Sequence, residues 1–161
     1  MKNLKKLYIF LIAIILITSC NDDILNLTNP NSYDTGTFFQ SEEELELATN
    51  AVYAGLYFGG LWIREYYFIF DLLGNDASVA TALQGELAEF AKYTYDAAHG
   101  QINVYWRSLY RIVLRANLVI DKGTEYINKN GESDKVERFM AEAKFLRAYA
   151  YSELVNQFGR V

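Results

Sequence analysis

Cysteine, histidine and proline each occur only once in the 161 residues of this chain. A single cysteine excludes a disulfide within the chain, and a single histidine leaves no metal site of the usual His/Cys kind. A catalytic Cys–His pair would have to join Cys20 to His99, and Cys20 ends an apolar leader, which favours a different role. No phosphate-binding loop or nucleophile–base pair is present, so we expect no cofactor and rank an enzyme as the least favoured class.

Basic residues are also few. Fifteen Lys and Arg stand against twenty Asp and Glu, which gives a net charge of −5. If residues 1–19 are removed, three lysines leave with them, and the mature charge becomes 12 − 20 = −8. Such a surface repels phosphate, so we expect no nucleic-acid partner and favour a neutral, hydroxyl-rich ligand over a polyanion.

Apolar residues, in contrast, are plentiful. They make up 52% of the chain and aromatic residues 16%, enough for the core of about one domain. Thirteen tyrosines exceed what packing needs, because each buried hydroxyl requires a partner. We therefore expect some tyrosines at the surface.

The first twenty residues have the pattern of a leader. Three lysines precede eleven apolar residues, 7–17, a run too short to span a membrane and typical of a signal peptide over residues 1–19. Residues 17–20, ITSC, resemble the bacterial lipobox, which implies that Cys20 is acylated and becomes the mature N-terminus. The alternatives are an uncleaved signal anchor or a chance cysteine.

Turn-forming residues fill the segment after the leader. Residues 20–40 lack a helical period and predict a lipidated, extended tether. Asp22 and Asp23, directly after the cysteine, resemble the surface-export signal of Bacteroidetes lipoproteins. An ordinary solvated linker is the alternative.

Residues 41–161 predict an all-α body. Ser41 and Glu44 form a capping box that begins the first helix, and the glycine pair at 59–60 is expected to end it. A buried helix is expected over 61–73, and a long loop to Gly100 contains a short helix. The short helix is predicted over residues 86–92, and two longer helices over residues 104–129 and 134–158.

The last helix is predicted to be an inner one, capped by Ser133 and ended by Gly159. One apolar row holds Phe139, Ala143, Leu146, Ala150 and Leu154, and a second holds Ala141, Phe145, Ala148 and Val155. Two such rows predict neighbours on two sides. Because the chain stops soon after this helix, we expect a fragment of a longer helical protein.

The helix before it is expected to pair with it as an antiparallel hairpin, through a turn at Asn130 and Gly131. Asn117 is a polar residue on an apolar face, and we expect a structural hydrogen bond there rather than a ligand contact. The predicted face contains Trp106, Leu109, Tyr110, Val113, Asn117 and Ile120.

Three segments together resemble the SusD/RagB family of outer-membrane nutrient-binding lipoproteins. They are the lipobox with its acidic pair, residues 104–117 (VYWRSLYRIVLRAN), and residues 141–151 (AEAKFLRAYAY) continuing to the FGRV at 158–161. The match stops before the Pro-Leu that commonly follows in the family. The resemblance covers essentially this whole chain but only the N-terminal part of a family member.

The resemblance implies tetratricopeptide-like helix pairs, a SusC-like TonB-dependent transporter as partner, and binding of oligosaccharides or similar oligomers at the cell surface. The family's ligand residues cannot be transferred, because residues 59–100 follow no pattern that aligns. On chemistry alone, an indole and a phenol beside an amide and a carboxylate suit a sugar. The candidates are Trp62, Tyr66, Asn75 and Asp76.

Two alternatives remain open at this point. Trp62 and Tyr66 are core residues if the helix over 61–73 is fully buried. The second functional class is a structural or assembly lipoprotein whose helical surface only recruits proteins.

Overall fold

The computed structural model describes residues 38–78 and 85–161, and within these ranges every regular element is helical. The all-α prediction is confirmed there. Two compact units divide the chain, residues 1–38 and 39–161, and the elements below belong to the second. The predicted signal peptide, Cys20 and the Asp22–Asp23 pair lie outside the described residues.

The first described helix, α2 (Glu42–Tyr53), begins with the predicted capping box. The Ser41 hydroxyl accepts the Glu44 amide at 3.2 Å, and the Glu44 carboxylate accepts the Ser41 amide at 3.2 Å. The α-helix ends at Tyr53, however, and not at the glycine pair. Its chain continues through a 3₁₀ turn, Ala54–Tyr57, and a π-helical turn, Gly59–Ile63.

Gly59 and Gly60 therefore lie inside a turn. A side chain at Gly60 would collide with the hydroxyl of Ser108 and the carbonyl of Val104 on α5. Glycine is needed here because the turn passes directly against a helix backbone.

Helix α3 (Glu65–Leu73) starts four residues later than the sequence predicted, because the π-helical turn occupies the positions before it. Glu65, expected in the middle of a helix, instead begins α3 and is buried at 2% exposure, with Arg64 at 3.2 Å. Gly74 ends α3 as predicted.

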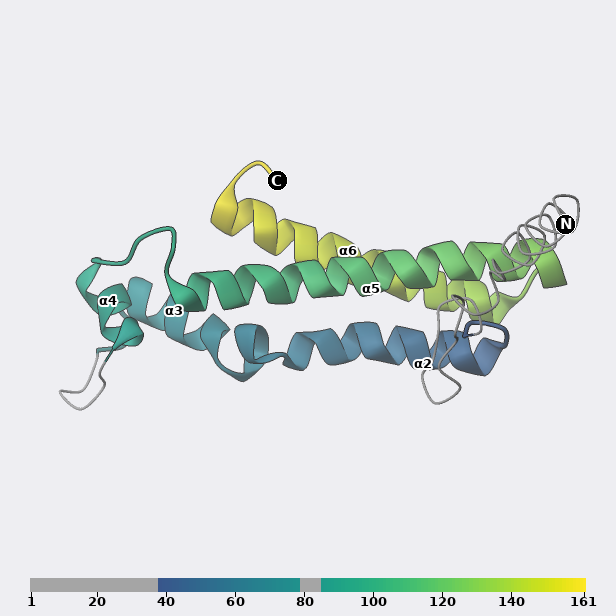
Figure 1. The fold of residues 1–161 in the computed structure, drawn as a ribbon, viewed down its shortest axis with the longest axis horizontal. Coiled ribbons are helices and arrows are strands. Elements are labelled where there is room, and N and C mark those ends of the chain that lie inside the picture. Colours follow the sequence, from purple (N-terminus) through teal and green to yellow (C-terminus); the bar gives the residue numbers. More distant parts are fainter. Residues whose placement is uncertain (1–37, 79–84) are drawn as a thin grey trace, which may run out of the picture. The chain divides into compact units, whose positions relative to one another are not determined.

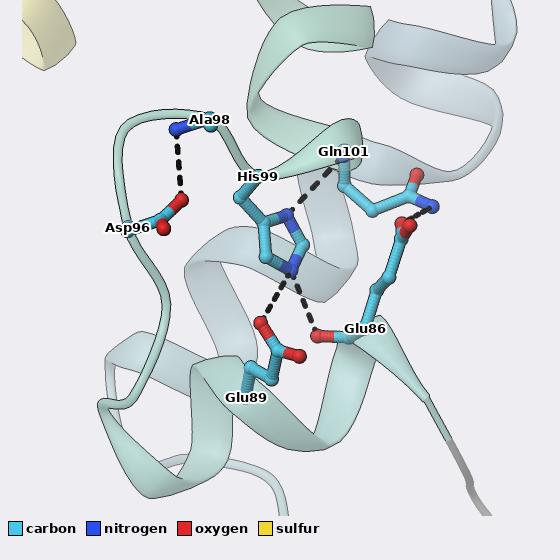
Figure 2. A network of polar contacts seen from close by, with 6 residues as sticks. All are labelled: Glu86, Glu89, Asp96, Ala98, His99 and Gln101. Atoms are coloured by element: carbon cyan, nitrogen blue, oxygen red, sulfur yellow. Dashed lines mark hydrogen bonds and ion pairs between the residues drawn. The ribbon is translucent and has the colours of Figure 1, made fainter.

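Helix α4 (Glu86–Lys92) has the predicted bounds, and His99 connects it to the next helix. The Nδ1 atom of His99 accepts the Gln101 amide at 3.2 Å, and Nε2 lies 2.9 Å from the Glu86 carbonyl (Figure 2). Because Nδ1 accepts, Nε2 carries the hydrogen and donates it to that carbonyl. The Phe90 ring lies 4.3 Å away. His99 thus caps α5, which starts at Gly100 and not at 104.

Helices α5 (Gly100–Asn130) and α6 (Asp134–Phe158) form the predicted hairpin (Figure 1). Trp106 contacts Phe158 with ring centres 4.7 Å apart, and Asn117 accepts a 2.7 Å hydrogen bond from Arg147. Residue numbers rise along one helix and fall along the other, so the pair is antiparallel. The structural role predicted for Asn117 is confirmed.

The buried face of α5 is rotated from the prediction. Leu109 and Val113 are buried as expected, but Trp106, Tyr110, Asn117 and Ile120 are only half-buried. Helix α6 covers one side of α5, while α2 and the turns after it cover another, so the buried arc lies between them. It contains Tyr105, Ser108, Leu109, Ile112, Val113, Ala116 and Val119.

The first apolar row of α6 is buried as predicted, with both α2 and α5 against that helix. The second row was wrongly predicted to be buried: Phe145 is 70% and Val155 51% exposed, and Ala141 and Ala148 are exposed too. Packing against α6 comes from one side only within the described residues. In these same residues, none of the helices combines the length and the apolar character that crossing a membrane requires.

Candidate functional site

Four elements bring aromatic and acidic side chains together around Trp62. Trp62 comes from the π-helical turn, Tyr66 from α3, Tyr105 from α5, and Tyr149 and Glu153 from α6. We call these five residues the Trp62 cluster. Two of them, Trp62 and Tyr66, were candidates from the sequence.

Trp62 is fixed at one edge and open at another. Its indole N–H donates to the Tyr149 hydroxyl at 3.1 Å, and the two rings meet edge to face with centres 6.0 Å apart. The side chain nevertheless remains 37% exposed. Trp62 is therefore not the fully buried core residue of the alternative interpretation.

Tyr66 is half-buried, and its ring centre lies 4.5 Å from that of Phe70. The adjacent Tyr67 is 53% exposed, with ring centres 5.9 Å apart. One side of Tyr66 thus packs inward while its neighbour faces solvent. Tyr66 is therefore partly a core residue and partly available to a ligand, the two roles that the sequence left open.

The Glu153 carboxylate lies among three tyrosine hydroxyls. It accepts the Tyr105 hydroxyl at 3.0 Å. Burial first, and the charge of Glu153 second, raise the pKa of Tyr105 and of Tyr66. Burial also raises the pKa of Tyr149, against the hydrogen bond from Trp62, which lowers it. All three hydroxyls stay protonated at neutral pH and remain hydrogen-bond donors.

This arrangement offers an aromatic surface next to hydroxyl donors and a carboxylate acceptor. A sugar ring presents C–H faces and hydroxyl groups, which match aromatic faces and polar tips in this combination. The cluster contains a hydrogen-bonded carboxylate but no nucleophile–base pair.

Asn75 and Asp76 lie elsewhere. They follow α3 while Trp62 precedes it, and nine helical residues separate the two ends by about 13 Å. Both are exposed; Asn75 has a φ of 65°, and the Asp76 amide donates to the Asp71 carbonyl at 3.2 Å. The structure brings Trp62 and Tyr66 together but does not bring Asn75 and Asp76 to them.

One shallow hollow adjoins the cluster through Tyr105, and a second lies beside the first. One of about 100 Å³ contains Tyr105, and the other, of about 250 Å³, shares Ile102 and Phe158 with it. Five of the eleven residues that line them are aromatic. Together the linings include Phe90, Tyr95, Ile102, Tyr105, Trp106 and Phe158.

Sequence reasoning missed Tyr105, Tyr149 and Glu153. The excess of tyrosines was the available signal, but their partners come from the pairing of α5 with α6 and of both with the π-helical turn. Glu153 is half-buried on α6, although an acidic residue in a helix is most often exposed. In residues 38–78 and 85–161, no three His, Cys, Asp or Glu side chains gather where they could hold a metal ion.

Comparison with known proteins identifies the class. The SusD-like family, described as starch-binding and associating with the outer membrane, matches residues 23–161 by its sequence profile. The chain belongs to this SusD-like family, as the resemblance of its motifs implied. The family description concerns binding and points to outer-membrane association.

Curated relatives carry the same family name at low identity. SusD-like protein P2 of Formosa agariphila is 26% identical over 156 residues, which is 94% of this chain and 29% of the relative. SusD-like protein P25 of the same organism is 26% identical over 132 residues, 76% of this chain and 24% of the relative. A SusD-like protein of Bacteroides ovatus is 23% identical over 156 residues, 97% of this chain and 28% of the relative.

The chain therefore spans less than a third of the length of these relatives. No solved structure matches it at a significant level.

Proposed function

We propose that this chain belongs to a cell-surface outer-membrane lipoprotein that binds oligosaccharides and passes them to a SusC-like TonB-dependent transporter. The observation that carries the proposal is the family match over residues 23–161. The protein holds its ligand and performs no chemistry on it. Other oligomers rich in hydroxyl groups fit the same description.

In this proposal the Trp62 cluster contacts the ligand. The exposed part of Trp62 stacks on a sugar ring, and Tyr66, at the next turn, extends the aromatic surface. Glu153 supplies an acceptor for sugar hydroxyls, and the hydroxyls of Tyr66 and Tyr149 supply donors, while Tyr105 holds the Glu153 carboxylate in place. Asn75 and Asp76, exposed at the far end of α3, would contact a more distant unit of a long oligomer.

The membrane is reached through lipid on Cys20. Removal of residues 1–19 leaves this cysteine at the N-terminus, with acyl chains that each contribute about 0.8 kcal/mol per buried methylene. The acidic pair that follows supports an outward-facing location. The transporter then lies in the same membrane.

A structural or assembly lipoprotein is the second candidate, favoured by one observation. Helix α6 exposes three large apolar side chains, those of Phe145, Tyr151 and Val155. Exposed apolar surface of this kind is typical of a site that binds other proteins. Ligand binding distinguishes the two functions, because a scaffold needs no affinity for sugars.

Calorimetric titration of the full chain with a panel of neutral oligosaccharides tests the proposal. We expect at least one to bind, and Trp62→Ala to weaken it about tenfold, which corresponds to about 1.4 kcal/mol. Tyr57→Ala is the matched control, since Tyr57 is 66% exposed outside the cluster. Absence of binding across the panel, or release of free sugars during it, would contradict the proposal.

A further inference from the structure

Three arginines form a row on one face of α5. Arg107, Arg111 and Arg115 follow one another at intervals of four residues, which aligns them along the helix. Arg107 and Arg111 are exposed, and Arg115 is half-buried. The row is unusual in a chain with an excess of acidic residues.

No acidic residue accompanies this row along its own stretch of α5. Residues 97–120 contain no Asp or Glu. In the part of the chain that the structure describes, no ion pair involves any of the three arginines. Like charges four residues apart on a helix repel each other. An anion bound between two of these arginines would therefore reduce their electrostatic repulsion.

Two of the arginines are held by contacts that leave their charge available. Arg115 donates to the Ala51 carbonyl at 2.6 Å, and its guanidinium lies 4.8 Å from the centre of the Phe58 ring. The guanidinium of Arg111 lies 5.6 Å from the same ring. Cation–π contacts fix a guanidinium without neutralising it. Side chains positioned in advance lose less conformational freedom when a ligand binds.

A hollow of about 110 Å³ lies between Arg107 and Arg111. Val104 and Ser108 complete its lining, and Ser108 is 3% exposed overall. At about 30 Å³ per water, the space corresponds to three or four water molecules. Its size suits one substituent of a larger ligand.

We propose that Arg107 and Arg111, with the Ser108 hydroxyl between them, bind an oxyanion substituent of an oligosaccharide, either a carboxylate or a sulfate ester. This inference rests on the proposed capture of oligosaccharides. The forked N–H groups of a guanidinium match the paired oxygens of both anions, and a hydroxyl adds a further donor. The ligand class thereby extends to acidic glycans.

The negative net charge of the chain does not prevent this. Exposed charges separated by more than about 8 Å are largely screened at physiological salt, so a bound group responds mainly to its immediate surroundings. Of the four residues that line the hollow, the two that carry a charge are Arg107 and Arg111.

Calorimetry on the full chain at physiological salt provides the test, with three probes of equal length: a galacturonate oligomer, a sulfated glucose oligomer and a neutral glucose oligomer. Arg107→Gln and Arg111→Gln should each weaken binding of an acidic oligomer by roughly tenfold to a hundredfold. Arg111→Lys, which keeps the charge but loses the fork, should fall between wild type and Arg111→Gln. Arg138→Gln removes an equal charge from α6, where Arg138 pairs with Glu142, and should leave binding unchanged.

The two acidic probes identify the preferred anion, and either preference supports the inference. It is overturned if neither acidic oligomer binds more tightly than the neutral one, or if the Arg107 and Arg111 variants bind like Arg138→Gln. Binding of inorganic sulfate alone overturns it as well. Trp62-dependent binding of a neutral oligomer would survive that result and preserve the proposed function, whereas failure of all the oligomers would overturn both.

Discussion

Tyr105 donates its hydroxyl hydrogen to Glu153 from a side chain that is only 2% exposed. The phenolate form would lose its hydration and face a carboxylate, so the folded protein holds this proton more tightly than the unfolded chain. Tyr66 and Tyr149 share the raised pKa, with burial as the largest cause for each. At the scale of single residues, burial thus keeps the site's hydroxyls in the donor form.

This difference predicts alkaline sensitivity. The ordinary tyrosine pKa is 10.0, and the folded-state values are higher, so their stabilising contribution is complete below about pH 10 and is lost as the pH rises above it. Thermal melts from neutral pH to pH 11 should show this decline. Tyr105→Phe should flatten it, and an unchanged slope in that variant would contradict the pKa argument.

Leu146 and Phe145 are adjacent on α6 but differ in burial, at 3% and 70% exposure. Leu146→Ala opens a cavity against the hairpin and should lower the free energy of unfolding by about 2–5 kcal/mol. Phe145→Ala, the matched control, should change it by less than about 0.5 kcal/mol in this chain. Urea denaturation measures both, and similar losses would show that the buried face of α6 is wrongly assigned.

At the scale of elements, several of the helix ends could be predicted from the sequence. Which helix faces are covered by other helices could not. Ser41 with Glu44, Ser133 and Gly159 mark helix ends through contacts within a few residues, and the structure has helix ends there. The burial of Phe145, in contrast, depends on which helices lie beside α6. The sequence alone shows that a face is apolar, but not what covers it.

The glycine pair at 59–60 shows the same limit. In sequence it is typical of a helix end, whereas in the structure Gly60 lets a turn approach Val104 and Ser108 on α5. That turn positions Trp62 against Tyr149, 87 residues away. The position of Trp62 in the candidate site therefore depends on a contact between distant segments, which no local sequence pattern predicts.

The turn between α5 and α6 gives a prediction at this scale. Gly131 has a φ of 96° and a ψ of 176°, and a Cβ there would meet nothing within 4 Å. Gly131→Ala should therefore cost about 1–3 kcal/mol through backbone strain alone. Glu132→Ala, at the exposed neighbouring position, should be nearly neutral in the same denaturation experiment. Equal stability of Gly131→Ala and wild type would contradict the strain argument.

At the scale of the whole molecule, the chain combines a predicted leader, residues 1–19 followed by Cys20, with a helical body that carries an aromatic cluster. Family membership links the body to outer-membrane binding proteins, while the leader supplies the proposed anchor. The two features are encoded in separate segments, so they are separable by mutation.

The anchor is tested in cells labelled with palmitate. Cys20→Ala should abolish labelling and leave an uncleaved or soluble product, because the thiol is the proposed site of acylation. Asp22→Ala is the control for the same segment and should keep the label. Palmitate retained by Cys20→Ala would place the lipid elsewhere and refute the proposed anchor.

The central claim is that the Trp62 cluster binds an oligosaccharide, and the indole N–H signals in a nitrogen–proton NMR titration test it most directly. The chain contains two tryptophans, Trp62 in the cluster and Trp106 beside Phe158, so two signals report on separate places. An oligosaccharide that binds in calorimetry should shift the Trp62 signal saturably, because its N–H donates to Tyr149 within the cluster, and should shift it more than the Trp106 signal. A bound oligosaccharide that leaves the Trp62 signal unmoved would contradict the account.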